Sequence, residues 1–459
     1  MCFRNFLTSW SYGNALTLDW REVLPPSDSC CILGNPPFVG KKEQTKEQKR
    51  DLMAVLKGVQ RAGVLDYVAG WYIKAASYIQ GTAICCGYVS TNSITQGEQT
   101  AVLWHTLLTC YHIKIYFAHR TFVWTSKARG KAAVHCVIIG FTAHNMPRKL
   151  LYDYDTPRSN PHEKEVKNIN PYLVESSDIT IPTRCAPICP TPVIQKGSFT
   201  LDGGHLTLSP VEKKEFAQKE PAALPYIKKY VGGREFINNE ERYCLWLKDA
   251  KPGELRSMPL VLARVERTRE FRLASKRETT KRLANTSALF AEIRQPVSDY
   301  ILVPNLSSER RKYIPIGFFN QRVIANSSSL VLPNATLYHF GVLTSLMHME
   351  WMRHVCGRLK NSYRYSSTLV YNNFPWPQDP TAKCKQAIES KAQAVLDTRA
   401  QYPNSTLADL YDPLTMPPPL RKAHQALDKA VDRAYRPQPF TDERSRMEFL
   451  LELYQHYTR

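Results

Sequence analysis

The residues of this chain that are best suited to chemistry lie in one short loop, Asn35-Pro36-Pro37-Phe38. The amide oxygen of Asn35 and the carbonyl oxygen of Pro36 can accept both hydrogens of an exocyclic amino group, and the ring of Phe38 can stack on the ring that carries it. The two prolines fix their own φ angles and hold the residues before them extended, so the loop is stiff. Engaging both N–H bonds leaves the nitrogen lone pair placed for attack on a methyl donor. A plain Asn-Pro turn is the alternative that the tetrapeptide alone leaves open.

The flanking sequence indicates which element positions this loop. A short apolar run at 30–33 predicts a buried strand, and Gly34 ends it. The loop would then lie at the carboxyl end of a strand, where open α/β sheets bind their ligands. Helix and strand patterns alternate from there to about residue 145, which is typical of a doubly wound sheet. We expect helices around 52–59, 65–79 and 102–108, strands at 83–90 and 113–117, and a central strand at 132–141.

The segment before the loop reads as a further short strand, 14–20, which ends in Asp19 and Trp20. An acidic residue at a strand tip of a Rossmann-like sheet can accept a hydrogen bond from the adenine or ribose of a bound cofactor. Trp20 could stack on the same cofactor. The local alternative is that Asp19 caps a helix that follows it, because Asp is a favoured N-cap residue.

Composition limits the class of protein. The chain has 459 residues, of which 43% are apolar, enough for two or three packed domains. Its formal net charge is +20 and its pI about 9.4, a balance typical of proteins that bind a polyanion such as nucleic acid. The 12 cysteines show no paired metal-binding spacing, so we expect no structural zinc site and no other metal. No apolar run approaches the roughly 18 residues of a membrane span, and we expect a cytoplasmic protein.

Basic residues gather between 264 and 282, where eight Lys and Arg stand among three Glu. Such a segment, if helical, could follow a phosphate backbone. A solvated helix whose charges are balanced by its own Glu residues is the alternative. The side chains that we expect to contact DNA are Arg264, Arg267, Arg269 and Lys281.

Two further basic groups lie downstream. Arg310 and Arg311 are adjacent, and Arg364 stands between Tyr363 and Tyr365. Alternating basic and aromatic side chains suit phosphate contact and base stacking, although turn and core positions would explain them as well. We expect these three arginines to contact DNA too.

The loop matches the Asn/Asp-Pro-Pro-aromatic signature of amino-methyltransferases. The chain as a whole resembles the MmeI-like enzymes, single-chain restriction–modification proteins that fuse nuclease, adenine methyltransferase and target-recognition domains. Matching blocks follow one another in the family's order along nearly the whole chain. These blocks are 13–20, 32–38, 90–99, 117–122, 131–141, 241–247, 310–318, 347–353 and 363–377.

The resemblance implies a class I methyltransferase that transfers methyl from S-adenosyl-L-methionine to the exocyclic amine of an adenine flipped out of double-stranded DNA. The four loop residues, 35–38, match the family's catalytic motif. Asp19, with Trp20 beside it, matches the acid that contacts the cofactor. Phe141, which ends the long apolar run, is expected to make a second contact with the flipped adenine.

The same resemblance sets the expected architecture, an α/β chain with four regions. A partial Rossmann-like methyltransferase sheet would occupy 1–150, and a proline-rich linker with the start of the recognition region 151–225. A mixed α/β target-recognition domain would occupy 226–378, and a small helical domain 379–459.

Two parts of the family pattern have no counterpart in this sequence: the nuclease, and the Gly-rich turn that grips the cofactor. We therefore expect a truncated or split protein that does not cut DNA and that an upstream polypeptide completes. The alternative is a DNA-recognition fragment or specificity subunit without turnover.

Overall fold

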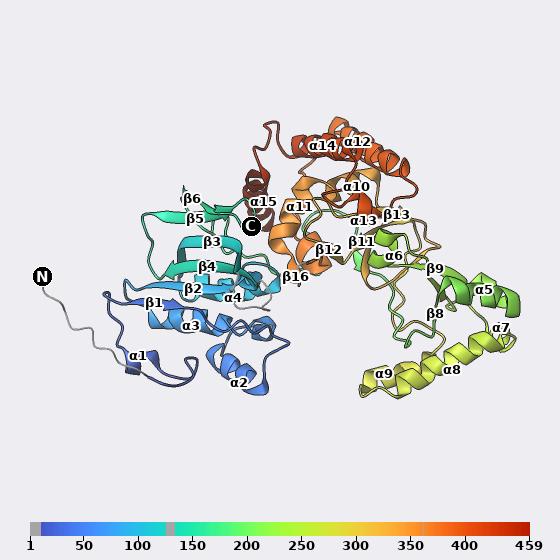
Figure 1. The fold of residues 1–459 in the computed structure, drawn as a ribbon, viewed down its shortest axis with the longest axis horizontal. Coiled ribbons are helices and arrows are strands. Elements are labelled where there is room, and N and C mark those ends of the chain that lie inside the picture. Colours follow the sequence, from blue (N-terminus) through green and yellow to red (C-terminus); the bar gives the residue numbers. More distant parts are fainter. Residues whose placement is uncertain (1–10, 125–133, 361) are drawn as a thin grey trace, which may run out of the picture. The chain divides into compact units, whose positions relative to one another are not determined.

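The computed structural model describes residues 11–124, 134–360 and 362–459. The chain divides into two compact units (Figure 1). Unit 1 contains Met1–Arg184, His354–Gly357 and Arg444–Arg459, and unit 2 contains Cys185–Arg353 and Arg358–Glu443.

Unit 1 is built on a 6-stranded mixed sheet with the order β1-β2-β4-β3-β5-β6. Pairing is parallel between β1 and β2 and between β3 and β5, and antiparallel elsewhere. The strands are β1 (Cys31–Gly34), β2 (Cys85–Thr91), β3 (Lys114–Trp124), β4 (Val134–Thr142), β5 (Lys149–Tyr154) and β6 (Pro161–Val166). The predicted α/β class is confirmed, and the long apolar run does form an interior strand, β4.

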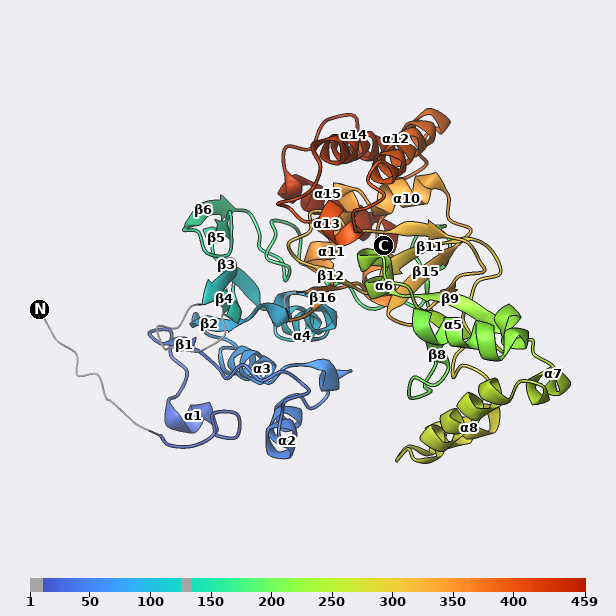
Figure 2. The same cartoon turned by 45° about the vertical axis from the view of Figure 1, so that its right-hand side comes forward.

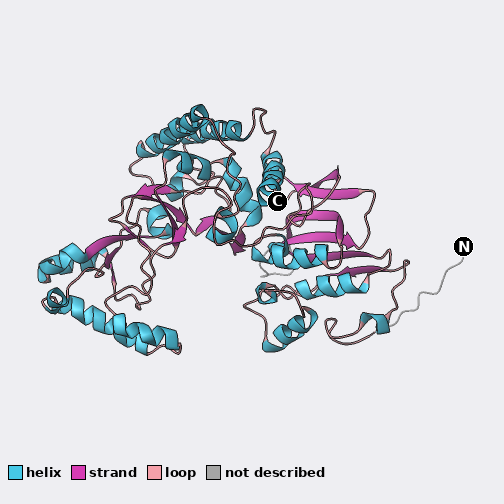
Figure 3. Ribbon diagram, turned by 180° about the vertical axis from the view of Figure 1, so that it is seen from behind, coloured by secondary structure: helices cyan, strands magenta, loops and turns pink. Residues whose placement is uncertain are grey.

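Two helices, α3 (Ala69–Tyr78) and α4 (Glu98–Thr109), bury their apolar sides in one core with this sheet (Figure 3). Tyr72 of α3 and Trp104 of α4 are fully buried there. The remaining helical segments of unit 1 are α1 (Trp20–Val23), α2 (Lys46–Val55), the short turns η1 (Ala62–Val64) and η2 (Asn92–Thr95), and most of α15 (Glu443–Thr458). Helix α2 begins earlier than the apolar pattern predicted, because Thr45 and Gln48 form a capping box.

The run at 30–33 forms the predicted strand, but the prediction that this strand is buried is wrong. Leu33 is 79% exposed and Cys31 is exposed as well. The reason is topological: β1 is the last strand on its side of the sheet, so among the described residues it has a neighbour only in β2. One edge of β1 therefore keeps backbone groups that no strand of the described chain pairs.

The strand predicted at 14–20 is also wrong. The chain turns there and enters α1, and Asp19 is the N-cap of that helix. Its carboxylate Oδ1 accepts a hydrogen bond from the Arg21 N–H at 2.9 Å. Local capping is the alternative that the sequence had left open, and it decides the conformation here.

Unit 2 contains short strands in several small sheets. One has the order β14-β9-β10-β8 and another the order β13-β11-β15-β7, while β12 pairs with β17 and β17 with β16. Their bounds are β7 (Gln195–Lys196), β8 (Thr207–Leu208), β9 (Ile227–Val231), β10 (Tyr243–Leu245), β11 (Tyr300–Pro304), β12 (Leu306–Ser308), β13 (Gly317–Phe319), β14 (Ile324–Ala325), β15 (Ser329–Pro333), β16 (Gly357–Leu359) and β17 (Ser362–Arg364).

The helices of unit 2 form two groups. Helices α12 and α14 lie side by side (Figure 2), and α10 packs on α12. The other group lines the small sheets and includes the basic segment, which forms α8 and α9. The bounds are α5 (Pro210–Lys219), η3 (Pro221–Tyr226), α6 (Gly233–Asn238), α7 (Pro252–Arg256), α8 (Pro259–Leu273), α9 (Glu278–Arg282), η4 (Leu283–Thr286), α10 (Leu337–Leu343), α11 (Leu346–Val355), η5 (Ser367–Tyr371), α12 (Ala382–Ala400), α13 (Leu407–Leu410) and α14 (Pro418–Tyr435).

Candidate active site

The Asn35–Phe38 loop follows directly on β1, at the carboxyl end of this strand, as the sequence predicted. Asn35 is exposed and Phe38 is 37% exposed, whereas Pro36 between them is buried. The buried proline anchors the loop in the domain and leaves the amide and the ring accessible. These are the two groups that an incoming amine-bearing ring needs.

The loop begins above an aromatic cluster. Gly34 pairs with Tyr88 of β2, and a Cβ on Gly34 would lie 3.0 Å from a ring carbon of Tyr88. The absence of a side chain at Gly34 therefore lets the strand end close to this ring. Tyr88 in turn contacts Tyr72 and Phe141, edge to face in both cases.

Phe141 belongs to this cluster and not to the loop. Its ring has no exposed surface and stacks on Tyr72 with 5.2 Å between the ring centroids. A flipped base would have to displace buried aromatic rings to reach it. The structure places Phe141 in the core, because every second residue of β4 faces the helices α3 and α4. The base contact expected of Phe141 stays a prediction.

Asp66 connects the loop to the neighbouring strand end, a role that the sequence did not reveal. Its Oδ1 accepts a hydrogen bond from the Lys41 N–H at 2.9 Å, and its Oδ2 accepts one from the Ser93 hydroxyl at 2.7 Å. Beside it, the Tyr67 N–H donates to the carbonyl of Val39 at 2.9 Å. One carboxylate therefore joins the segment after the Asn35–Phe38 loop to the segment after β2.

Replacing Asp66 by alanine should free both segments, because each loses a hydrogen bond to a charged acceptor. We expect methyl transfer to fall by about 10- to 100-fold, the scale of a misplacement of about 1 Å at a reacting centre. Hydrogen exchange at the Tyr67 amide, which does not bond to the Asp66 side chain, should become faster.

The control is Ser93→Ala, alone and combined with Asp66→Ala. Since Ser93 acts through Asp66, the double variant should be no worse than Asp66→Ala alone. Fully additive losses would contradict a shared contact.

Trp20, the residue after Asp19, lines an apolar cavity of about 380 Å³ next to β1. Trp20, Ile32 and Tyr78 contribute to its lining. The Trp20 indole N–H donates to the Ala15 carbonyl at 2.8 Å, so the ring is held in place. A cavity of this size with aromatic walls can take a planar heterocycle.

Lysine 74 lies next to this cavity. Its ammonium group is 5.7 Å from the centroid of the Trp20 ring and donates to the carbonyls of Leu16 and Leu18. Burial lowers the pKa of Lys74, and the negative charge of Asp19 opposes that shift. Lys74 therefore ties the 14–20 turn to α3 and fixes the cavity wall.

The basic segment 264–282 divides into buried and exposed arginines. Arg264 is partly buried: it donates to the carbonyls of His205 and Thr207 at 3.0 and 3.2 Å and forms an ion pair with Glu212. Its guanidinium is therefore engaged within unit 2, and the DNA contact expected of Arg264 stays a prediction. Arg272, which the sequence analysis did not single out, is fully buried.

The other predicted DNA contacts in this segment are exposed. Arg267 and Lys281 face solvent, and Arg269 is exposed while paired with Glu266 at 2.9 Å. Among the downstream arginines, Arg364 is exposed. These four side chains are free of burial and can reach a phosphate backbone.

Arg310 and Arg311 differ from each other. Arg310 is exposed, with its guanidinium 3.8 Å from Asp412. Arg311 is half-buried, and burial lowers the pKa of its guanidinium. Arg310 therefore remains accessible for a DNA contact, whereas Arg311 is less so.

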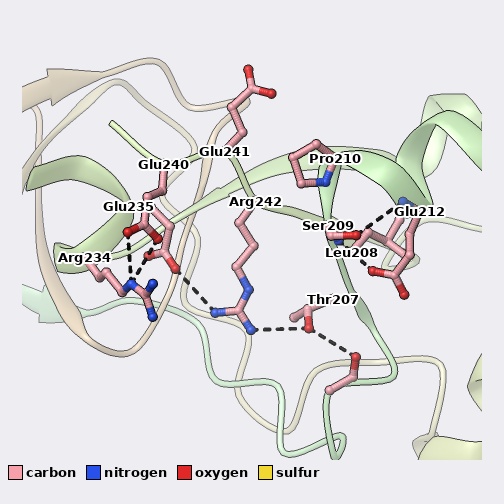
Figure 4. Close-up of a pocket in the computed structure, with 11 residues that line it drawn as sticks. Thr207, Leu208, Ser209, Pro210, Glu212, Arg234, Glu235, Glu240, Glu241 and Arg242 are labelled. Atoms are coloured by element: carbon pink, nitrogen blue, oxygen red, sulfur yellow. Dashed lines mark hydrogen bonds and ion pairs between the residues drawn. The ribbon is translucent and has the colours of Figure 1, made fainter. Parts of the chain in front are cut away.

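A second cavity, of about 480 Å³, lies in unit 2 and carries charges of both signs (Figure 4). Arg242 lies 3.4 Å from Glu235 and 3.3 Å from the Thr207 hydroxyl, and Arg234 pairs with Glu240. Because the arginines are matched by carboxylates, this cavity adds little to the basic surface.

Two kinds of feature were sought across the described parts of the chain and not found. No group of three or more His, Cys, Asp or Glu side chains in those parts could hold a metal ion. Nor does any helix in them have the length and apolar character needed to cross a bilayer.

Comparison with known protein families gives matches that cover most of both units. The MmeI DNA-methyltransferase domain matches residues 8–153, the MmeI target recognition domain 175–378 and the MmeI C-terminal domain 380–459. The chain belongs to the MmeI family. Residues matched to the methyltransferase domain include the Asn35–Phe38 loop, the strands β1 to β4 and all of β5 except Tyr154.

Two relatives show how much of an MmeI-family protein this chain represents. It is 39% identical over 449 residues to DNA methyltransferase A of Bacillus subtilis (strain 168), covering 97% of this chain and 50% of that protein. It is 49% identical to the Type IIL restriction–modification enzyme MmeI, solved in complex with DNA, with a TM-score of 0.87 over 97% of this chain and 59% of that chain. The chain thus spans about half the length of the curated relative it matches.

Proposed function

We propose that this chain takes part in transferring methyl from S-adenosyl-L-methionine to the N6 amine of an adenine in double-stranded DNA, as part of a restriction–modification system in the cytoplasm. The observation that carries the proposal is the exposed Asn35 and Phe38 on either side of a buried Pro36, at the carboxyl end of β1. This loop lies in the part of the chain that matches the MmeI methyltransferase domain.

In the proposed reaction Asn35 and Pro36 accept the two amine hydrogens, and Pro37 keeps the loop extended. Phe38 stacks on the flipped adenine. The base must leave the duplex to reach this loop, and Phe38 replaces part of the stacking that the base loses. These hydrogen bonds would hold electron density on the amine nitrogen and orient its lone pair toward the place where a bound methyl donor would lie.

The residues present fit the adenine end of S-adenosyl-L-methionine. The aromatic cavity at Trp20 suits an adenine ring, and we keep the adjacent Asp19, the N-cap of α1, as the proposed polar contact. When bound, S-adenosyl-L-methionine supplies an electrophilic methyl group. The Gly-rich turn that would hold its methionine end has no counterpart in the sequence given.

We further propose that an upstream polypeptide completes the site. The support is the edge of β1 described above, flanked by exposed Leu33 on one face and by the Trp20 cavity on the other. A strand added parallel to β1 would place alternate side chains against these two surfaces.

For the target-recognition domain we propose the bounds 226–378, after the methyltransferase part at 1–150 and a segment at 151–225 that holds a linker and the start of the recognition region, with 379–459 as a helical end. Exposed Arg267, Arg269, Lys281, Arg310 and Arg364 are the proposed phosphate contacts. The second candidate function is sequence-specific DNA binding without turnover, supported by the match of residues 175–378 to the MmeI target recognition domain.

Adding the upstream half of the family sequence as a separate polypeptide distinguishes these two functions. Under the enzyme proposal, the mixture methylates DNA and loses this activity when Asn35 is replaced. DNA binding without methylation in the mixture would favour the recognition fragment.

Lys281→Ala is expected to weaken DNA binding about equally for all sequences and to reduce the slope of log affinity against log salt by about one, because it removes one phosphate contact. Fluorescence anisotropy of labelled duplexes at several salt concentrations measures both. Arg322→Ala, an exposed arginine in a turn of unit 2 outside the basic segment, is the matched control. An equal loss in both variants, or an affinity that does not depend on salt, would contradict the assignment.

A further inference from the structure

Two cysteines lie directly opposite each other at the free edge of the unit 1 sheet. Cys31 of β1 is the pairing partner of Cys85 of β2, in a parallel register. Neighbouring strands lie about 4.8 Å apart, and paired residues of parallel strands point to the same face. This spacing falls within the Cα separation that a disulfide allows, about 4.4 to 6.8 Å.

Both thiols can be reached from solvent. Cys31 is exposed and Cys85 is half-buried, and the next residue of β1 on the same face, Leu33, is also exposed. The neighbouring cysteines differ, because strand residues alternate between faces. Cys86 pairs with Ile32 and is buried at 1% exposure, in the core.

We propose that Cys31 and Cys85 form a redox-active dithiol that closes to a reversible disulfide. With hydrogen peroxide as the oxidant, one thiolate attacks the peroxide to give a sulfenic acid and hydroxide, which is protonated to water. The second thiolate then attacks the sulfenic sulfur, the S–S bond forms and hydroxide leaves as a second water. Two electrons pass from the sulfurs to the peroxide, so the step balances.

The positions of Cys31 and Cys85 make their disulfide easy to reduce and let it affect the Asn35–Phe38 loop. Cys31 is exposed, and exposed disulfides are among the readily reduced ones. Because β1 lies at the edge, it can adjust when the bond forms. The Cys31–Cys85 disulfide would then link β1 covalently to β2, four residues before Asn35. This link would restrict the motion of the Asn35–Phe38 loop. This inference does not depend on methyl transfer.

The test treats the full chain with hydrogen peroxide, blocks remaining thiols with N-ethylmaleimide, and maps peptides by mass spectrometry without reduction. We expect one intrachain link, between Cys31 and Cys85, that dithiothreitol removes. Cys110 and Cys185, which are exposed elsewhere on the chain, serve as internal controls and should keep their thiols longer. Oxidation of these two cysteines ahead of the pair, or a link from Cys31 to any other cysteine, would overturn the proposal.

A second measurement tests whether the two thiols lie close together without requiring an S–S bond to form. Phenylarsine oxide bridges two nearby thiols through one arsenic atom and releases one water. The wild-type chain should bind one arsenic at Cys31 and Cys85, and Cys31→Ser and Cys85→Ser should each abolish this adduct while leaving circular dichroism unchanged. An adduct that persists in either variant would show that the two thiols do not act as a pair.

Discussion

Replacing Asn35 by alanine should reduce methyl transfer to DNA by at least about 100-fold, the usual loss when one preorganised hydrogen-bonding group is removed from a reacting centre. The side chain is exposed on a loop that buried Pro36 anchors, so its loss should leave the fold intact. DNA affinity should change by less than about twofold, because the proposed phosphate contacts all lie in unit 2. Incorporation of labelled methyl and anisotropy of a labelled duplex measure the two quantities on the same sample.

The matched control is Asn35→Asp. An aspartate keeps an oxygen at the same place and is the other residue that the amino-methyltransferase signature allows. It should therefore retain more activity than alanine. If alanine and aspartate lose activity equally, or if alanine retains more than about a tenth of it, Asn35 does not hold the amine.

Replacing Arg272 by methionine should destabilise unit 2 by about 3 to 5 kcal/mol, the cost of breaking a buried, fully bonded charged group. Its guanidinium donates five hydrogen bonds to backbone carbonyls at 2.8 to 3.0 Å. The acceptors are Thr200, Leu201, Leu283, Thr286 and Leu289. These carbonyls come from segments before and after α8, so one side chain holds three stretches of the chain together.

Urea unfolding followed by hydrogen–deuterium exchange of peptides from 200–290 measures this loss within unit 2. Arg267→Met is the control: it lies on the same helix and is exposed, so its effect on stability should stay within about 0.5 kcal/mol. A loss below about 1 kcal/mol for Arg272→Met would mean that the carbonyls find other partners.

The contrast between buried Arg272 and exposed Arg267 shows what the sequence could predict about the basic segment 264–282. The sequence offered a helix for this segment only as a condition, and the structure forms two there, α8 and α9, with exposed Arg267 and Arg269. The sequence could not separate Arg264 and Arg272 from Arg267, because the partners of the buried pair lie up to 72 positions away. A helical pattern does carry part of the signal, since Val261, Val265, Thr268 and Arg272 recur every three or four residues on one face.

Near the Asn35–Phe38 loop, the sequence predicted the structure correctly wherever one strong local pattern had no competing pattern. The prolines located the turn, and the long apolar run located β4. The prediction failed at Asp19, where a strand pattern competed with a helix cap, and the cap's hydrogen bond decided the outcome. It failed at Leu33 because an apolar run shows that a strand forms and not how many neighbours the strand has.

Asp66 could not be found from the sequence for a related reason. Its partners Lys41 and Ser93 lie 25 and 27 positions away, in segments that meet only when β1 and β2 pair. Nothing in a single acidic residue before α3 distinguishes it from a solvated carboxylate. Asp66 joins these two segments only after β1 and β2 pair in the folded chain, and the sequence alone does not show that pairing.

The most direct test of the central claim identifies the methylated nucleoside. The chain, with the upstream half of the family sequence supplied, is incubated with labelled S-adenosyl-L-methionine and mixed-sequence duplex DNA, and the DNA is digested to nucleosides. We predict label in N6-methyl-2′-deoxyadenosine alone, and none with Asn35→Ala. Label in a methylated cytosine, or no label while the mixture binds DNA and cofactor, would contradict it.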